Sequence, residues 1–590
     1  MKRIVLILLV PVMAGMLYRC AKITAPVGGP KDITPPRVLQ CVPANHSAHF
    51  KGDKFSVTFD EYIQLDKMNQ QLLISPPVKD MPDYRLKNKT LIIKFKNPLK
   101  PNTTYTVFFG DAIADLNEGN VLKNFSYVFS TGDYVDSLSM RGVVKSALTH
   151  EPVDNVTVML YKNNNDTLSL ASLPLYVKPY YVSKTNKNGQ FYFSGLADTS
   201  YMMFALQDQN YSLTFDQPNE NIAFIDSMVK PQYRPAPVLD SALMDTIRLH
   251  TAKDSVQYKI DSLVRQADSI ADLKLTNYQL YLFSQPDSVL KLLRSGLVKP
   301  NVLKFVFTLP PDSLRIQCLN FSPDTTWYLP EWNKERDSLT WYLHQPHPDT
   351  LKLMVYNGSK RLDSLDMRVA PKENKFSRRK KKQEEKKKVY LSWKSDLKSG
   401  AIKPGDTLHL IFDQPVVKLN LDSALFVQNK DSIYHPRALF TDTIHRILAF
   451  PFDVRQGSKY TLFLPDSTIK DWNGLENNDI RLSFKAKTAD EYGVITLLIS
   501  VAQKQHYILQ MLDNKGKVLE TRLFSSSGSN SFTNLDPGKY SFRIIVDANR
   551  NGRWDPGNYF RHLEPEKVIY FPKTINVRAN WEIKEDWSVK

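Results

Sequence analysis

The chain has 590 residues, enough for about four or five domains of ordinary size. Hydrophobic residues make up 42% and aromatic residues 11% of it, so each domain can bury a core. The formal charge is +17. Much of it lies in one segment, because residues 372–388 include ten basic and only three acidic residues, and so it is not gathered on the binding face of a folded domain. The basic run from Arg378 to Lys388 has no interleaved aromatic residues to stack on bases, so nucleic acid is a poor fit as a partner.

The chain begins with the features of an export signal. Lys2 and Arg3 precede an apolar run over 4–18, and Cys20 follows. A membrane-spanning helix needs about twenty apolar residues, so this run is too short to span comfortably. A charged start, a short apolar segment and a nearby processing point indicate a signal peptide over residues 1–19.

Residues 20–33 form a Gly/Pro/Thr-rich tether that favours neither helix nor central strand. The pattern of Cys20, seven residues, then GGPKD and TPP resembles the start of Bacteroidetes-type surface lipoproteins with a bacterial Ig-like domain of the S-layer type. The resemblance implies that Cys20 is lipidated and that the protein is anchored to the outer membrane, facing the cell surface. Leu17 fits a lipobox, but Arg19 stands where a small residue is usual. A plain cleaved signal is therefore the alternative.

Residues 34–133 alternate apolar and polar positions in several short runs, as in Phe55, Val57 and Phe59. A period of two with frequent turns predicts half-buried strands, and their spacing predicts an Ig-like sandwich. Residues 389–488 repeat the pattern. The segment YTLFLPDSTIKDWNG over 460–474 corresponds to YTVFFGDAIADLNEG over 105–119.

A second unit also occurs twice, over 138–228 and 491–590. The segments 193–216 and 532–555 share six residues at a constant offset, among them Tyr201/Tyr540 and Asp208/Asp547. The first copy resembles a carboxypeptidase-regulatory-like, transthyretin-type sandwich, which is the non-catalytic partner in proteins that carry it. The chain thus contains the same pair of domains twice.

Between the two pairs, residues 253–271 have the apolar spacing of a short connecting helix. Alternation returns over 277–370, which predicts a divergent β-sandwich, and 371–388 is a basic linker. The predicted fold class is all-β, with tandem Ig-like and transthyretin-like sandwiches and one short connecting helix.

Two loops could hold calcium, the one cofactor that the sequence suggests. Oxygen-bearing side chains alternate around a glycine in the second copy, as in an EF-hand loop, although no helix flanks it. The candidate ligands are Asp547, Asn549, Asn551 and Asp555, with Asp208, Asn210 and Asp216 in the first copy. The alternative is a purely structural hairpin, because Asx side chains also bond their own backbone.

Searches for catalytic motifs find no nucleophile elbow, zinc-protease helix, phosphate loop or Cys-x-x-Cys pair, so we expect no enzyme. Trp327, Trp332 and Trp341 could stack on sugar rings, or could belong to a sandwich core. Asp-(Ser/Thr)-apolar triplets occur nineteen times. This resembles the O-glycosylation motif of Bacteroidetes-type exported proteins, although such triplets also start strands.

These features predict a non-enzymatic envelope lipoprotein that acts as a binding or scaffold component. The expected role is an accessory subunit of an outer-membrane protein assembly or transport complex, with an integral outer-membrane protein or another envelope protein as its partner. The alternative is a glycan-binding cell-surface protein.

Overall fold

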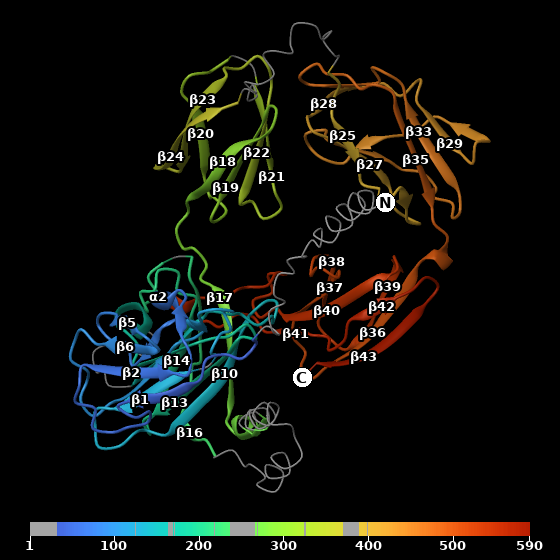
Figure 1. The fold of residues 1–590 in the computed structure, drawn as a ribbon. Coiled ribbons are helices and arrows are strands. Elements are labelled where there is room, and N and C mark those ends of the chain that lie inside the picture. The colour runs from blue at the N-terminus through green and yellow to red at the C-terminus, as the bar shows by residue number, and fades with distance from the viewer. Residues whose placement is uncertain are drawn as a thin grey trace, which may run out of the picture. The chain divides into compact units, whose positions relative to one another are not determined.

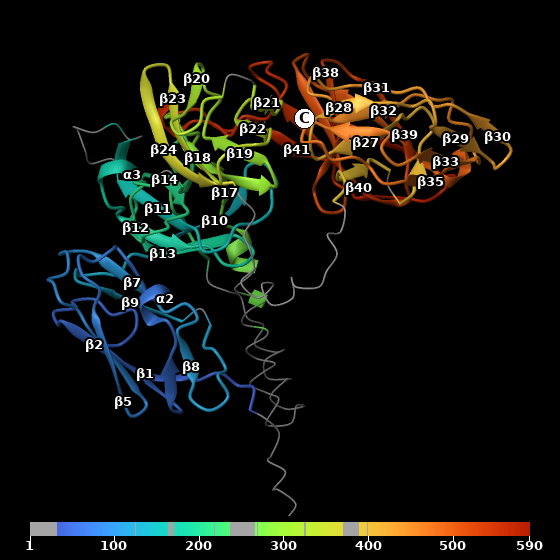
Figure 2. The same cartoon turned by 90° about the horizontal axis from the view of Figure 1, so that it is seen from above.

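In the described part of the computed structural model, nearly all of the regular secondary structure is strand (Figure 1, Figure 2). The structure describes residues 32–590 except 124, 163–168, 170–171, 218, 236–262, 264–265, 268–269, 324–325, 370–388, 398 and 590. The predictions for the signal peptide, Cys20, most of the tether and the basic linker lie outside these residues. Two compact units divide the chain, Met1–Phe283 and Ser284–Lys590. The predicted all-β fold class is confirmed.

The first sandwich contains a four-stranded sheet, β1-β2-β6-β5, a three-stranded sheet, β4-β7-β9, and the ribbon β3-β8. One apolar cluster joins the two larger sheets. The elements are β1 (Val38–Val42), β2 (Lys54–Phe59), β3 (Ile63–Leu65), α2 (Met68–Gln71), β4 (Leu73–Ser75), β5 (Asp83–Lys87), β6 (Thr90–Lys94), β7 (Thr104–Phe108), β8 (Ile113–Asp115) and β9 (Ser126–Ser130).

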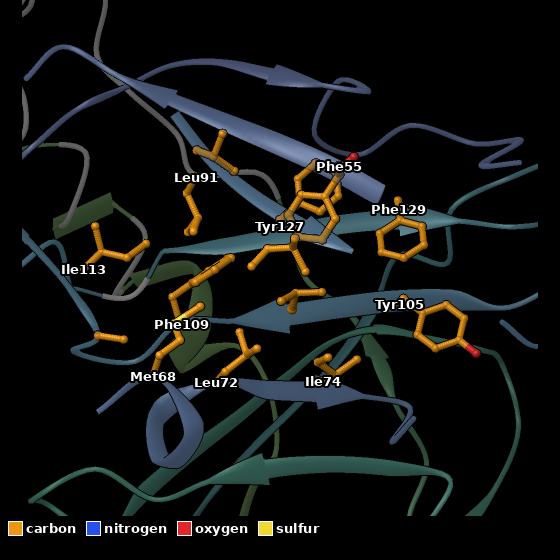
Figure 3. Packing of buried hydrophobic residues seen from close by; sticks show 14 of the residues in the cluster. Phe55, Met68, Leu72, Ile74, Leu91, Tyr105, Phe109, Ile113, Tyr127 and Phe129 are labelled. Carbon is orange, nitrogen blue, oxygen red and sulfur yellow. The ribbon is translucent and has the colours of Figure 1, made fainter. Parts of the chain in front are cut away.

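Alternation along these strands places large side chains in the core, as the sequence predicts (Figure 3). Phe55 and Phe59 on β2 are at most 1% exposed. The Phe55 ring stacks on that of Tyr127, with ring centroids 4.0 Å apart. Each such burial contributes about 1.5 to 3 kcal/mol, so this cluster accounts for much of the sandwich's stability.

The second sandwich has one large sheet, ordered β12-β11-β14-β15-β17-β10-β13, with β16 paired to β10. Its elements are β10 (Leu138–Ser146), β11 (Thr157–Lys162), α3 (Leu173–Tyr176), β12 (Tyr181–Lys184), β13 (Gln190–Leu196), β14 (Tyr201–Leu206), β15 (Asn221–Phe224), β16 (Gln232–Tyr233) and β17 (Asn277–Ser284).

Strand β17 differs from its predicted place. The sequence put residue 277 at the start of the third sandwich, but β17 pairs in parallel with β10, with Arg141 opposite Asn277. Leu280 and Leu282 complete the core of the second sandwich. Alternation of apolar and polar residues identifies a strand, but it does not show which sheet the strand joins. Because β17 lies far along the sequence from β10, the sequence did not indicate that the two strands pair.

The third sandwich packs the sheets β18-β19-β22-β21 and β20-β23-β24 around one core. Its strands are β18 (Leu292–Lys299), β19 (Val302–Phe307), β20 (Leu314–Cys318), β21 (Tyr328–Trp332), β22 (Ser338–Leu343), β23 (Thr350–Asn357) and β24 (Lys360–Arg368).

The fourth sandwich has the sheets β25-β27-β32-β31 and β26-β35-β33-β29-β30, with the ribbon β28-β34. Its strands are β25 (Trp393–Ser395), β26 (Ala401–Ile402), β27 (Leu408–Phe412), β28 (Val416–Leu419), β29 (Leu425–Gln428), β30 (Ser432–Tyr434), β31 (Leu439–Phe440), β32 (Ile447–Phe450), β33 (Lys459–Leu464), β34 (Ile469–Asp471) and β35 (Ile480–Ala486).

The fifth sandwich combines β39-β36-β43 with β38-β37-β40-β41, and β42 also pairs with β40. Its elements are η3 (Ala489–Glu491), β36 (Gly493–Val501), β37 (Tyr507–Leu512), β38 (Val518–Phe524), β39 (Gly528–Leu535), β40 (Gly538–Val546), η4 (Tyr559–Arg561), β41 (Val568–Tyr570), β42 (Ile575–Val577) and β43 (Glu582–Val589). Its last strand, β43, pairs in parallel with β36, as β17 does with β10.

Corresponding hydrogen bonds support both sequence repeats. The Tyr201 hydroxyl donates to the carbonyl of Ala197 at 3.0 Å, and the Tyr540 hydroxyl donates to the carbonyl of Asp536 at 2.7 Å. In the Ig-like copies, the hydroxyls of Tyr105 and Tyr460 each accept a backbone N–H five residues earlier at 2.8 Å.

In the residues that the structure describes, helix is confined to short segments. Within 253–271, residues 263, 266–267 and 270–271 are helical, and the rest of that predicted connector lies outside the described residues. The one-turn helices α2 and α3 were not predicted, because four residues are too few to show helical periodicity. In the described part of the chain, no helix has the length and hydrophobicity needed to cross a membrane.

Candidate functional site

The Asp-x-Asn loop after β40 is tied together by Asp547. This side chain is 4% exposed. Its Oδ1 accepts the N–H of Asn551 at 3.0 Å and its Oδ2 accepts the N–H of Gly552 at 3.0 Å. Asp555 closes the loop, because its Oδ2 accepts the side-chain amides of Asn549 and Asn551. The four predicted residues therefore lie together.

The first copy of the loop has the same construction. The carboxylate of Asp208 accepts the N–H groups of Ser212 and Leu213 at 3.1 and 2.9 Å. The amide of Asn210 donates to Asp216 at 3.1 Å. Leu213 has a φ of 59° where the second copy has Gly552 at 74°. A left-handed residue with a side chain costs about 1 to 2 kcal/mol, which the hydrogen bonds to Asp208 offset.

A glutamate in each loop was missed by the sequence analysis. Glu566 accepts the N–H groups of Ala548 and Asp555 at 2.8 and 3.2 Å. Glu220, fully buried, accepts those of Gln209 and Asp216 at 3.1 and 3.2 Å. The constant offset between the copies ends at this point, because Glu566 follows its aspartate at a longer interval. The sequence signal that could have identified Glu566 and Glu220 is the presence of a glutamate downstream of each loop.

The carboxylates in the second loop lie close enough to affect one another. Burial raises the pKa of Glu566, and the negative charges of Asp555 and Asp547 raise it further, against the effect of the two N–H donors. The donors are all oxygens, the type that calcium prefers. Each Asp547 oxygen is already bonded to the backbone, however, and the described residues contain no group of three or more His, Cys, Asp or Glu side chains placed to hold a metal. Calcium binding stays an untested prediction, and these hydrogen bonds favour its alternative, a structural hairpin.

The three candidate glycan-binding tryptophans belong to the core of the third sandwich. Trp341 is 2% exposed and its ring stacks on that of Tyr328, with centroids 4.0 Å apart. Trp327 and Trp332 are partly buried and pack against the same apolar cluster. These side chains do not form the exposed platform that stacking on a sugar ring requires, so the core interpretation fits them better.

A pocket lies where the fourth and fifth sandwiches meet, lined by residues that include Lys403, Asp406, Lys487 and Tyr492. Lys487 pairs with Asp536 at 2.7 Å, and the Lys403 ammonium donates to the carbonyl of Asn534 at 2.6 Å. Because the lysines are engaged within the protein, the pocket is best explained as a polar junction between domains.

The loops at one end of the fourth sandwich bind the third sandwich. We call Asp413, Gln414, Pro415, Trp472 and Asn473 the second loop face. Asp413 pairs with Lys299, and the amide of Gln414 donates to the carbonyl of Pro300 at 2.9 Å. Asn473 donates to the carbonyl of Leu343 at 3.1 Å and accepts the N–H of Gln345 at 2.9 Å.

An arginine beside this face completes the contact. Arg446 pairs with Glu331 at 2.8 Å and lies 4.5 Å from the ring centroid of Tyr342. Glu331 also accepts the hydroxyl of Tyr342 at 2.6 Å. The Arg446 side chain is 17% exposed, so this ion pair is shielded from much of the solvent. The Ig-like loops therefore serve as a surface that holds another β-sandwich.

Comparisons with known proteins match part of the chain. Residues 32–131 match the family model of the bacterial Ig-like domain. No curated protein matches. The solved structures include the major pilin subunit BcpA of Bacillus cereus, at 8% identity over 77% of this chain and 99% of that one, with a TM-score of 0.13. The S-layer protein SbsC gives 11% identity, 92% and 68% coverage and a TM-score of 0.13. Neither likeness supports an argument about function.

Proposed function

We propose that the protein is a non-enzymatic lipoprotein of the bacterial envelope that binds other proteins through its sandwich loops. Its role is that of an accessory subunit in an outer-membrane assembly or transport complex. The observation that carries the proposal is the contact in which the second loop face holds the third sandwich through Asp413, Gln414 and Asn473. A domain of this type uses its loops for protein recognition within this chain. The bacterial Ig-like match over 32–131 supports extending that use to the first copy.

The anchor is part of the same proposal. Lys2, Arg3, the apolar run and Cys20 fit an exported chain that is lipidated on Cys20. From position 20 to position 32 the tether reaches about 40 Å at most, at about 3.5 Å per residue. Lipidation would therefore keep the first sandwich near the outer-membrane surface, within reach of integral membrane proteins.

Native purification tests the proposal. The tagged full-length chain is extracted from membranes in mild detergent, and its companions are identified by mass spectrometry. We expect an integral outer-membrane protein to co-purify with the wild-type chain, and the matched variant Cys20→Ser to leave the membrane fraction and lose that companion. A wild-type chain recovered as a free monomer without lipid would contradict the proposal.

Some Asp-(Ser/Thr)-apolar triplets are proposed to carry O-glycans. Asp363 and Asp442 are partly buried, and Asp442 accepts the N–H groups of Arg446 and Ile447 at a turn, which supports a structural use there. Asp406 is exposed, whereas Thr407 is partly buried and Leu408 is buried, so only part of this triplet faces solvent. The intact mass of the mature protein tests whether any triplet is glycosylated, since a mass equal to that of the chain plus lipid excludes glycans.

A further inference from the structure

The first sandwich carries the counterpart of the second loop face. We call Asp60, Glu61, Tyr62, Leu116 and Asn117 the first loop face. The Leu116 N–H donates to the carbonyl of Tyr62 at 3.0 Å, and the Trp472 N–H donates to that of Pro415 at 2.9 Å. Lys89 corresponds to Arg446, because Phe59 and Phe412 donate their N–H groups to the carbonyls of these two residues, each at 2.9 Å.

The two faces differ in exposure. Tyr62 and Leu116 are 55% and 53% exposed. Their counterparts are not, since Pro415 is buried and Trp472 is partly buried. Trp472 also contacts His344 of the third sandwich, with ring centroids 5.1 Å apart. Two large apolar side chains are thus presented to solvent at the position where the other copy binds a β-sandwich.

The occupied face indicates what the exposed face recognises. Asp413 binds Lys299, which begins the two-residue hairpin turn between β18 and β19. Asp60 keeps the carboxylate at this position. Gln414 donates its amide to the carbonyl of Pro300, but Glu61 stands in its place, and a carboxylate accepts only. The partner of the first loop face must therefore offer a donor where Pro300 offers an acceptor.

The negative charge around Glu61 favours a cationic donor on the partner. Partial burial raises the pKa of Glu61, and the nearby carboxylates of Asp115, Asp60, Asp32 and Glu118 raise it further. Asp32 lies near the face because the amide of Asn120 donates to its carbonyl at 3.1 Å. Two basic residues lie beside Asp60: the Lys89 ammonium donates to its backbone carbonyl at 2.6 Å, and the backbone N–H of Arg37 donates to its Oδ1 at 2.7 Å, which leaves the carboxylate charges of the face in excess. A negative field of this kind attracts basic groups and repels anionic lipid.

We propose that the first loop face binds a second protein through a β-turn that carries two adjacent basic residues, one for Asp60 and one for Glu61. The turn docks as the Lys299–Pro300 turn docks on the second loop face, with Tyr62 and Leu116 covered at its flanks. This inference rests on the proposed function and names the surface and the chemistry of the partner.

Site-specific photo-crosslinking of the full-length chain in native outer membranes tests the inference. Tyr62 is replaced by the photoreactive residue benzoylphenylalanine, and Tyr84, also exposed but on edge strand β5 of the same sandwich, is replaced in a control. We expect an adduct at position 62 that is absent at position 84. Peptide mapping should place it on a segment of another protein with two adjacent Lys or Arg residues.

A matched variant makes the test specific. Adding Asp60→Asn and Glu61→Gln removes both charges while keeping the shape, and we expect the adduct to fall at least about tenfold, the effect of losing close charge pairs at an interface. An undiminished adduct, an adduct to lipid or to a segment without basic residues, or no adduct at position 62 would overturn the inference. If an outer-membrane protein still co-purifies in any of these cases, the proposed function stands while this surface is excluded.

Discussion

The two Ig-like sandwiches share their loop hydrogen bonds and differ in what those loops contact. The fourth sandwich holds the third through Asp413, Gln414 and Asn473. The first keeps the carboxylate and the asparagine but exposes Tyr62 and Leu116. The loop backbone thus sets the position of the surface, and a few side chains decide its partner. The comparison thus distinguishes the loop hydrogen bonds, which the fold requires, from the exposed side chains, which recognition requires.

Equivalent core substitutions should have the largest effect and should not distinguish the copies. Phe59 and Phe412 are 0% and 1% exposed at corresponding positions. We expect Phe59→Ala and Phe412→Ala each to destabilise its sandwich by about 3 to 5 kcal/mol, through lost burial and a residual cavity. Urea unfolding with domain-resolved hydrogen exchange measures both. An effect below about 1 kcal/mol in either copy would show that its core is not packed as described.

Removing the cation beside each loop face should distinguish the copies. Arg446→Ala removes the charged partner of Glu331, which keeps only the Tyr342 hydroxyl, and we expect a loss of about 2 kcal/mol in the contact between the third and fourth sandwiches. Lys89→Ala, the matched change, should cost less than about 1 kcal/mol in the purified chain, because Lys89 donates to the carbonyl of Asp60 within its own sandwich. Calorimetric unfolding compares them, and equal losses would contradict the difference between the faces.

The Asp-x-Asn loops allow a smaller comparison. Asp547→Ala leaves the Gly552 N–H without its acceptor and the Asn551 N–H with the Asn549 amide oxygen alone, which we expect to cost about 1 to 3 kcal/mol. Asp208→Ala should cost less, because that residue is less buried than Asp547. Hydrogen exchange at residues 551–552 and 212–213 reports the local loss. Unchanged exchange at both positions would show that the carboxylates do not hold the loops.

Calcium removal should have the smallest effect. Because the oxygens of Asp547 and Glu566 are bonded to the backbone, we expect the melting temperature to be the same in EDTA and in millimolar calcium. A rise of several degrees in the melting temperature with calcium, absent from the Asp547→Ala variant, would instead show that the loop binds calcium.

The fold could be predicted from the sequence because alternation is a local signal. Phe55, Val57 and Phe59 occupy the core as their spacing predicts. The sheet to which β17 belongs could not be predicted, because parallel pairing with β10 depends on a partner far away in the sequence. The loop residues Asp547 and Asn549 were found by their repeat, whereas Glu566 was missed where the repeat loses its register.

Recognition surfaces were the least predictable part. For Trp327, Trp332 and Trp341 the sequence left a sugar-binding platform and a sandwich core as alternatives, and all three side chains pack in or against one core. The sequence repeat aligned 105–119 with 460–474, which contain Leu116 and Trp472 of the two loop faces. It could not show which of these side chains is exposed, because exposure depends on the neighbouring domain.

Hydroxyl-radical footprinting of the anchored chain, compared with the purified chain, tests the central claim most directly. In the purified protein, we expect Tyr62 and Leu116 to be oxidised readily. Trp472 should be oxidised more slowly than a fully exposed tryptophan, because it is partly buried. In native outer membranes, Tyr62 and Leu116 should become protected while Trp472 does not change. Equal oxidation of Tyr62 and Leu116 in both settings would contradict the claim that this surface binds an envelope partner.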